Sequence, residues 1–451
     1  MRTACLSWIF ALALASLATA QTQWRAGTAR REITPRGPIW MGGYAARKHP
    51  SEGVLQPLWA KALVLEDRQQ ARAVFVSLDL IGIDRRLADA VGERVLQKTG
   101  IPRERIVLNC SHTHSGPVVA GVTPLVYDLD PQQQAKVDAY AKNLEDELVL
   151  LVAAAAKDLR PAALAFGEGR ATFGANRRAM RAKAASPTQP AAPSLPAPVD
   201  HGVPVLQVRD DHGGVRAVVF GYACHNTTLG IYQINGDYAG FAQAALESRH
   251  PGATALFMSG CGADINPHPR SEVELARKHG SSLAAAVDEV LAGSMQAVRG
   301  PLAIAFQRVD LKLVDPPGKQ QLERLLLDKN VYQQRLAKHL LGELAAGRRL
   351  PTSYPCPVQV LRFGDDLLLV ALAGEVCVDY ALRLRREFAG RPVWVAAFSN
   401  EVFAYVPSER VLREGGYEGG AAMVYFGLHG PFQPGLEQRL IDTVKRLADK
   451  P

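Results

Sequence analysis

The sequence contains few charged residues and lacks several patterns that would assign it to a special class of protein. Charged residues make up only 21% of the 451 positions against 47% hydrophobic ones, which excludes a disordered chain and a coiled coil. After the N-terminus, no apolar run approaches the roughly 18–20 residues that a membrane helix needs. There is no CxxC pair for a zinc ribbon and no internal repeat. The length fits one large catalytic domain or two fused halves.

The excess of positive charge is mild. Lys and Arg number 52 against 44 Asp and Glu, and the basic residues are scattered along the chain. A nucleic-acid-binding protein needs a concentrated basic patch with aromatic residues for stacking, so we exclude nucleic acid as a partner. The charge instead favours solubility or peripheral contact with an anionic membrane surface.

The first 20 residues have the pattern of a secretory signal peptide. Arg2 precedes an apolar run from Ile9 to Leu17, and Ala18-Thr19-Ala20 forms a small-residue cleavage site. We therefore expect a mature chain that starts at Gln21 and is secreted or periplasmic.

An odd number of cysteines follows this segment, so at least one thiol is free or intermolecular, and the sequence does not give their connectivity. A nucleophilic cysteine is one interpretation, but small buried residues at strand ends are the favoured one. These residues are Cys110, Cys224, Cys261, Cys356 and Cys377.

Short apolar runs alternate with helical patterns along the chain. Continuous hydrophobicity is typical of strands that are covered on both faces. The predicted strands are Ala73–Leu78, Ile106–Leu108, Ala217–Tyr222, Ala255–Met258, Leu367–Leu372 and Val393–Phe398. The predicted helices are Gln132–Leu159, Ala239–Ser248, Glu272–Ala292, Lys319–Ala346, Val376–Phe388 and Leu436–Ala448.

This order predicts an α/β layered sandwich, in which a central, mostly buried sheet is flanked by helices. A Pro/Ala-rich segment near residues 184–198 has no apolar period and is interpreted as an exposed insertion. The strand pattern continues on both sides of it, so residues 21–451 are expected to form one catalytic domain.

Polar residues follow several of the predicted strands, where open α/β sheets place their sites. His112 and His114 come after one strand, His225 after a second and Glu375 after a third. Two histidines, a carboxylate and a water are a common zinc set. Each histidine could instead be structural, and Glu375 alone could be a charge partner of a helix N-terminus. A carboxylate in an apolar stretch nevertheless needs a partner, and a metal would supply it.

A set of short motifs resembles the neutral/alkaline, non-lysosomal ceramidase family. The motifs are Met41-Gly42-Gly43-Tyr44, His112-Thr113-His114-Ser115-Gly116-Pro117, Ala223-Cys224-His225-Asn226-Thr227-Thr228, Gly236-Asp237-Tyr238-Ala239-Gly240, Gly262-Ala263-Asp264-Ile265-Asn266-Pro267, Tyr405-Val406 and Tyr417-Glu418-Gly419. They occur in the order of that family, from about Trp24 to the C-terminus.

The resemblance implies one Zn²⁺ per chain and a set of residues around it. The metal ligands would be His112, His225, Glu375 and Tyr405, and the residues that assist substrate or transition state would be His114, Arg177 and Tyr417. Without the resemblance, the arginine would be interpreted as half of a solvated basic pair and the tyrosines as core aromatics.

Two departures from the family pattern concern the substrate and mechanism. Asn266 occupies the position of a serine in the family hexapeptide, so no serine nucleophile is present there, and an amide could still hold substrate. The chain also ends soon after its last predicted helix, without room for the family's C-terminal immunoglobulin-like domain. Ceramide itself therefore stays open as the substrate.

The sequence predicts a secreted amidohydrolase that acts on a linear amide bond of a ceramide-like N-acyl lipid or related N-acylated compound, using a zinc-activated water. A metallo-esterase on the same scaffold and a non-catalytic envelope binding protein are the alternatives. Asp264 either accepts a hydrogen bond from a ligand histidine or caps a turn before Pro267. Gly236-Asp237 is interpreted as a helix cap.

Overall fold

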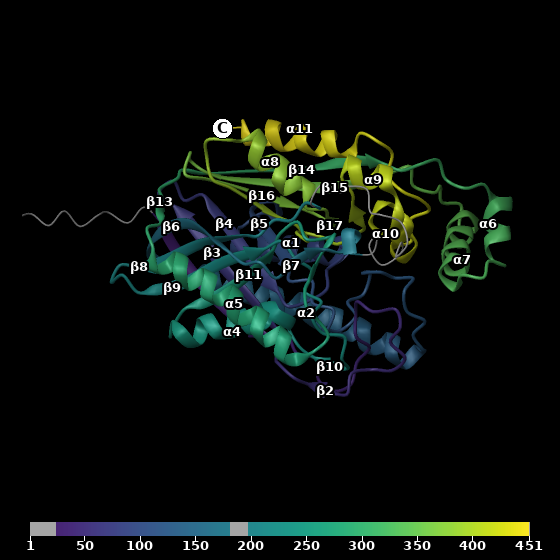
Figure 1. Cartoon of the computed structure of the whole chain (residues 1–451), viewed down its shortest axis with the longest axis horizontal. Coiled ribbons are helices and arrows are strands. Elements are labelled where there is room, and N and C mark those ends of the chain that lie inside the picture. The colour runs from purple at the N-terminus through teal and green to yellow at the C-terminus, as the bar shows by residue number, and fades with distance from the viewer. Residues whose placement is uncertain (1–23, 181–196, 451) are drawn as a thin grey trace, which may run out of the picture.

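A computed structural model describes residues 24–180 and 197–450 (Figure 1). The predicted signal peptide and nearly all of the Pro/Ala-rich segment lie outside the described residues. No helix within these two ranges is long and apolar enough to cross a bilayer.

The centre of the fold is a stack of two β-sheets. In spatial order, the larger sheet contains β11 (Thr254–Ser259), β9 (Val215–Tyr222), β8 (Gly202–Asp210), β6 (Arg160–Arg170), β1 (Trp24–Glu32), β3 (Trp59–Asp67), β4 (Arg72–Leu78) and β5 (Ile106–Cys110), with β13 (Gln296–Val298) beside β6. The smaller sheet contains β14 (Leu302–Lys312), β15 (Ser353–Phe363), β16 (Leu367–Leu372) and β18 (Val393–Ala396). Phe75 of the larger sheet and Leu369 of the smaller belong to one buried cluster between them. The layered α/β fold is confirmed, and its centre consists of two stacked sheets.

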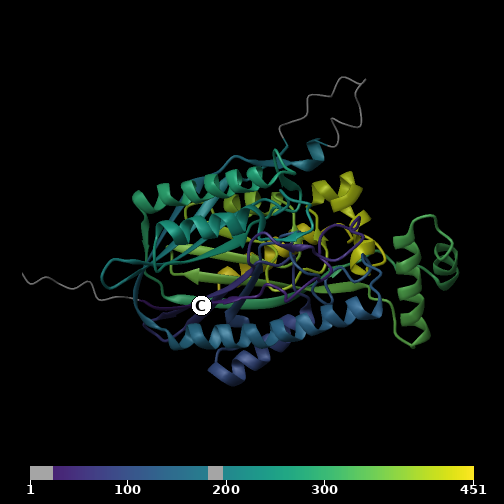
Figure 2. The same cartoon turned by 90° about the horizontal axis from the view of Figure 1, so that it is seen from below.

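Helices cover the outer faces of both sheets. On the larger sheet, α1 (Arg85–Thr99) and α2 (Pro131–Lys157) pack beside α4 (Asp237–Arg249) and α5 (Val273–Ala292). On the smaller sheet lie α8 (Asp379–Glu387) and α11 (Leu436–Ala448). Figure 1 shows α8 and α11 above the sheets and α4 and α5 below, and Figure 2 shows α2 beside that second pair.

Coverage on both faces explains why the strands are apolar without alternation. In β4, Ala73 and Phe75 face the smaller sheet, whereas Val74 and Val76 face the helices. Both sets of side chains are buried, so both positions of the two-residue period must be hydrophobic.

Most predicted helices form within a few residues of the expected bounds, but two do not. The helix predicted over Lys319–Ala346 is two helices, α6 (Lys319–Leu325) and α7 (Val331–Ala345), because Asn330 caps α7 by accepting a hydrogen bond from the Tyr332 amide. The helix predicted over Val376–Phe388 begins only at Asp379, because residues before it form a strand.

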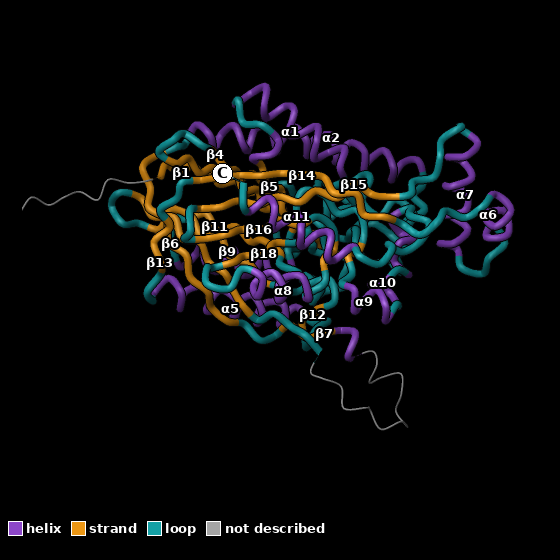
Figure 3. The backbone as a smooth tube through the Cα atoms, turned by 90° about the horizontal axis from the view of Figure 1, so that it is seen from above, coloured by secondary structure: helices purple, strands orange, loops and turns teal. Residues whose placement is uncertain are grey.

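Short strand pairs and short helical segments build the loops around the sheets in the described ranges. The strand pairs are β10 (Gln233–Ile234) with β2 (Gly53–Val54), β12 (Ile265–Pro267) with β7 (Gly174–Asn176), and β17 (Glu375–Val376) with β19 (Tyr405–Val406). The helical segments are α9 (Glu409–Glu414), α10 (Gly416–Gly419), η1 (Arg103–Arg105) and η2 (Ala421–Phe426). Figure 3 shows α6 and α7 as a hairpin that projects beyond one end of the sheets.

Parallel strand pairs bring the loops of both sheets to one end. β4 pairs with β5, β9 with β11 and β16 with β18 in parallel. Single bridges then join the sheets there, between Asn109 and Ser399 and between Gly260 and Ala396. The predicted convergence of strand ends is therefore present.

Candidate metal centre and active site

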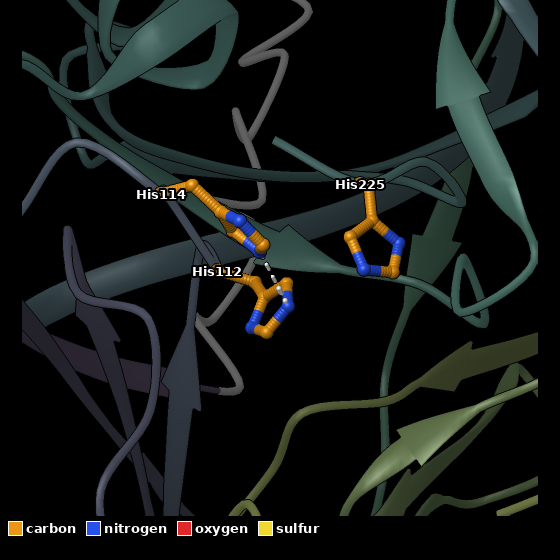
Figure 4. A group of neighbouring side chains, drawn as sticks. All are labelled: His112, His114 and His225. Atoms are coloured by element: carbon orange, nitrogen blue, oxygen red, sulfur yellow. Dashed lines mark hydrogen bonds between the residues drawn. The ribbon is translucent and has the colours of Figure 1, made fainter. Parts of the chain in front are cut away.

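Three histidine side chains converge where β5 and β9 end (Figure 4). Candidate ligand atoms of His112, His114 and His225 all lie within 4.8 Å of one another, and His112 Nε2 is 3.1 Å from His114 Nε2. His112 and His225 are almost fully buried. The larger sheet thus supplies a compact group of imidazoles.

Glu375 reaches the same point from the smaller sheet. Its Oε2 atom lies 3.4 Å from His112 Nε2 and 3.2 Å from His225 Nε2. This oxygen is buried and accepts no well-formed hydrogen bond from any described residue. The centre therefore lies between the two sheets and contains an unsatisfied carboxylate oxygen.

The backbone fixes the protonation of two of these histidines. Nδ1 of His112 lies 2.6 Å from the Ile81 carbonyl oxygen, and Nδ1 of His225 lies 2.7 Å from that of Gly262. A carbonyl only accepts, so each Nδ1 carries the proton and each neutral Nε2 presents a lone pair toward Glu375.

Two lone pairs and a carboxylate oxygen that face one another repel, and a cation between them would relieve that repulsion. Tetrahedral zinc with bonds of about 2.0–2.1 Å separates its ligand atoms by about 3.3 Å, close to the two distances from Glu375. The donor set and its spacing therefore fit a metal ion of this kind.

Electrostatics favour the same protonation states. Burial and the nearby Arg177 lower the pKa of His225 to about 4, and burial with the two neighbouring histidines lowers the pKa of His114 well below its usual range. Burial alone would raise the pKa of Glu375, but positive charge on the neighbouring imidazoles would hold it well below the usual range, so the carboxyl is ionised whenever they are protonated. At neutral pH the imidazoles of His114 and His225 are therefore neutral, which is the form that binds a metal.

Tyr405 and Arg177 form the next layer of the site. Tyr405 is the direct neighbour of Glu375 across the parallel pair β17 and β19. Arg177, just after β7, donates from Nη2 to the Tyr405 hydroxyl at 3.1 Å and from Nε to the buried carboxylate of Glu418 at 2.7 Å. Arg177 thereby fixes the position of the tyrosine.

A cavity of about 90 Å³ opens onto the centre. Five predicted ligand or assisting residues line it: His112, His114, Glu375, Tyr405 and Tyr417. Val126, Tyr127, Tyr425 and Phe426 are among the other residues of its wall. Asn266, on β12, is not part of this lining. Its Oδ1 atom lies 3.4 Å from Nη1 of Arg177. The structure brings Asn266 to the site only through that arginine.

Of the two roles considered for Asp264, that of acceptor for a ligand histidine is wrong. Its carboxylate accepts from the Val378 amide at 2.9 Å and from Asn176 Nδ2 at 3.1 Å, so it holds loops together. Backbone carbonyls take the histidine protons instead. The helix-cap interpretation is confirmed, since Gly236 precedes α4 as its N-cap.

The cysteines are structural, as the favoured interpretation expected. All five in the described ranges are free and buried. Burial raises the pKa of the Cys110 and Cys224 thiols, which disfavours the thiolate that a nucleophile needs.

Sequence reasoning missed residues that shape the histidine group. A Cβ atom at Gly43 would lie 2.4 Å from the His114 ring, and the Tyr44 ring meets that imidazole edge-on at 5.0 Å. Phe398 packs 4.4 Å from the His112 ring, and both have positive φ, 49° and 59°. The Met41-Gly42-Gly43-Tyr44 motif signalled the first two, whereas no sequence pattern singled out Phe398.

Comparison with known proteins gives consistent matches. The family model described as "Neutral/alkaline non-lysosomal ceramidase, N-terminal" matches residues 24–311. The curated "Neutral ceramidase" of Pseudomonas aeruginosa is 25% identical over 500 aligned positions, covering 95% of this chain and 72% of that protein.

Two solved structures share the fold. The crystal structure of neutral ceramidase from Pseudomonas aeruginosa matches with a TM-score of 0.73 at 21% identity, covering 95% of this chain and 74% of that one. A structure titled "Ceramidase complexed with C2" also gives 0.73 at 21% identity, with 95% and 75% coverage. Glu375, Tyr405 and Tyr417 lie beyond the segment that the family model matches. The matched segment nevertheless covers most of the chain and carries all three histidines, and the chain belongs to the neutral/alkaline non-lysosomal ceramidase family.

Proposed function

We propose that the chain is a secreted, zinc-dependent amidohydrolase that cleaves the linear amide bond of a ceramide-like N-acyl lipid. One observation carries the proposal: the buried Oε2 atom of Glu375 accepts no hydrogen bond from the described residues while it faces Nε2 of His112 and His225. Family membership supports amide hydrolysis, and the curated relative is named a neutral ceramidase.

The residues that would hold the ion are His112, His225 and Glu375, with Tyr405 beside them. His114 lies close enough to be an alternative fourth ligand. A zinc ion, when bound, supplies a Lewis acid that polarises the scissile carbonyl and lowers the pKa of water.

The remaining residues of the site have separate tasks. His114 lines the cavity, and as a neutral imidazole it can take up a proton and return it to the leaving amine. Tyr417 presents a hydroxyl that can donate to the developing oxyanion. Arg177 remains charged, because Tyr405 and Glu418 raise its pKa although burial alone would lower it. That fixed charge favours negative charge developing nearby.

The cavity wall suits an amide with an attached hydrocarbon. Its histidines and carboxylate can face the amide, while Val126 and Phe426 present apolar surface to the adjoining carbons. The signal-peptide pattern supports export of the enzyme.

The test is a screen of the purified, zinc-loaded protein against N-acyl amides, ceramides and esters, read by mass spectrometry. We expect amide hydrolysis with about one zinc per chain, and loss of both zinc and turnover in His112→Ala and His225→Ala. His250→Ala is the control, because His250 pairs with Asp288 away from the cavity.

The other outcomes separate the alternatives. Full zinc content in both variants contradicts the ligand assignment. Hydrolysis of esters alone identifies a metallo-esterase, and tight zinc binding without any turnover identifies an envelope binding protein.

A further inference from the structure

The α6–α7 hairpin exposes a group of large hydrophobic side chains at its turn. Leu327 is 88% exposed, Leu326 39% and Val331 44%. No other large hydrophobic residue of the described ranges is as exposed as Leu327. Exposed hydrophobic side chains that lie close together at one turn are candidates for a site of contact.

These three residues do not serve the hairpin's own packing. Its buried face consists of Leu322, Leu336 and Leu340, which form one cluster with Val424 of η2. The turn residues lie outside that cluster, so the hairpin would keep its core without them.

The hairpin is fastened to the rim of the catalytic cavity. Arg335 of α7 donates from Nη1 to the carbonyl oxygens of Leu125 at 3.2 Å and Val126 at 2.7 Å. The Tyr332 ring lies 4.9 Å from that of Tyr425, and both Val126 and Tyr425 line the cavity. Figures 1 and 2 show the hairpin standing out from the body of the molecule at this end.

The exposed charges on the hairpin are mostly positive. The basic ones are Lys319, Arg324, Lys329, Lys338, Arg348 and Arg349. The acidic residues of the same stretch are fewer: Glu323, whose carboxylate lies 3.9 Å from Lys319, Asp328 in the turn, and Glu343, which pairs with Arg348. Exposed leucines among lysines and arginines suit the interface of a bilayer that contains anionic lipids.

We propose that the α6–α7 turn inserts Leu326, Leu327 and Val331 into the interface of an anionic lipid bilayer and holds the cavity mouth at the membrane surface. A role of this docking in catalysis rests on the proposed lipid substrate. The binding of the turn to the bilayer does not depend on substrate turnover. Burial of one leucine favours partition roughly ten- to a hundredfold, and nearby basic residues add salt-sensitive attraction.

Co-sedimentation of the zinc-loaded full chain with vesicles tests the docking. The vesicles are phosphatidylcholine with or without about 30% phosphatidylglycerol. We expect binding to the mixed vesicles, about tenfold or more weaker in Leu327→Asp and weakened by salt in the wild type. Leu96→Asp is the matched control, because Leu96 is also exposed, at 47%, but lies on α1.

Three results would overturn the proposal: no vesicle binding by the wild type, equal loss of binding in Leu96→Asp, or no loss in Leu327→Asp. Self-association that Leu327→Asp abolishes, without vesicle binding, would assign the turn to a second copy of the chain.

Hydrolysis assays separate this proposal from the proposed function. Leu327→Asp should slow turnover of a vesicle-embedded N-acyl lipid and leave a water-soluble short-chain amide unaffected. If the wild type hydrolyses neither compound, the proposed function fails, and co-sedimentation still decides whether the turn docks on lipid.

Discussion

Glu375→Gln isolates the contribution of the buried carboxylate to metal binding. The change keeps the shape of the side chain but removes the charge from an oxygen that lies 3.4 and 3.2 Å from two imidazole nitrogens. A neutral amide is a poorer zinc ligand, so we expect affinity to fall by about a hundredfold or more, or about 2.7 kcal/mol. At saturating metal, the stabilisation that zinc adds to the free energy of unfolding should fall by the same amount.

The metal-free protein should respond differently. The new amide nitrogen can donate a hydrogen bond to an Nε2 lone pair, so the free energy of unfolding without metal should stay within about 1 kcal/mol of wild type. Elemental analysis gives the zinc content, and calorimetry with zinc and with chelator gives the two stabilities.

Glu401→Gln is the matched control for this experiment. Glu401 is also a buried carboxylate, but it pairs with Arg308 at 3.2 Å and accepts from the Tyr354 hydroxyl at 3.1 Å. Its change should reduce stability by about 1–3 kcal/mol and leave the zinc content unchanged. Wild-type zinc content and an unchanged zinc-induced shift in Tm for Glu375→Gln would refute the reasoning.

Three further predictions concern other parts of the chain. Gly43→Ala places a methyl group against the His114 ring, so kcat should fall by about tenfold or more. The circular dichroism spectrum should stay native. An unchanged kcat would show that the ring moves aside freely. Asn266→Ala should lower activity by about ten- to a thousandfold, because the contact with Arg177 is lost. In the native protein, no covalent acyl-enzyme should accumulate during turnover. An acyl-enzyme trapped on the native protein would contradict a direct attack by water. Intact-mass analysis of the exported protein should show an N-terminus at or near Gln21, and a mature product that retains residue 1 would contradict the signal peptide.

The meeting of the proposed ligand residues could be predicted because the signal for it is local. His112, His225 and Glu375 each follow an apolar strand within a few residues, and the carboxyl ends of strands meet where sites form. The four-residue apolar spacing of Leu87, Val91 and Val95 also signalled α1, although this helix was not predicted.

What could not be predicted depends on contacts between distant parts of the chain. The apolar pattern of the strands predicts cover on both faces, but it does not say that a second sheet, the one that contains Leu369, covers Phe75. Val376 looked helical, but pairing with Val406 makes it a strand, so tertiary contact overrode the local pattern. The contact of Phe398 with His112 is of the same kind.

The placement of the centre between two sheets has a consequence for how the chain gains and keeps its structure. His112, His225 and Glu375 are separated by roughly a hundred residues or more along the chain. An ion held by all three would act as a cross-link, and closing a loop of about 100 residues restricts the unfolded chain by about 4.7 kcal/mol in the chain-entropy account. The site does not exist until the strand at Glu375 has paired, so a growing chain that ends before that strand has no complete place for the ion. Folding must therefore come first, and capture of the proposed metal would then slow unfolding of the finished sandwich.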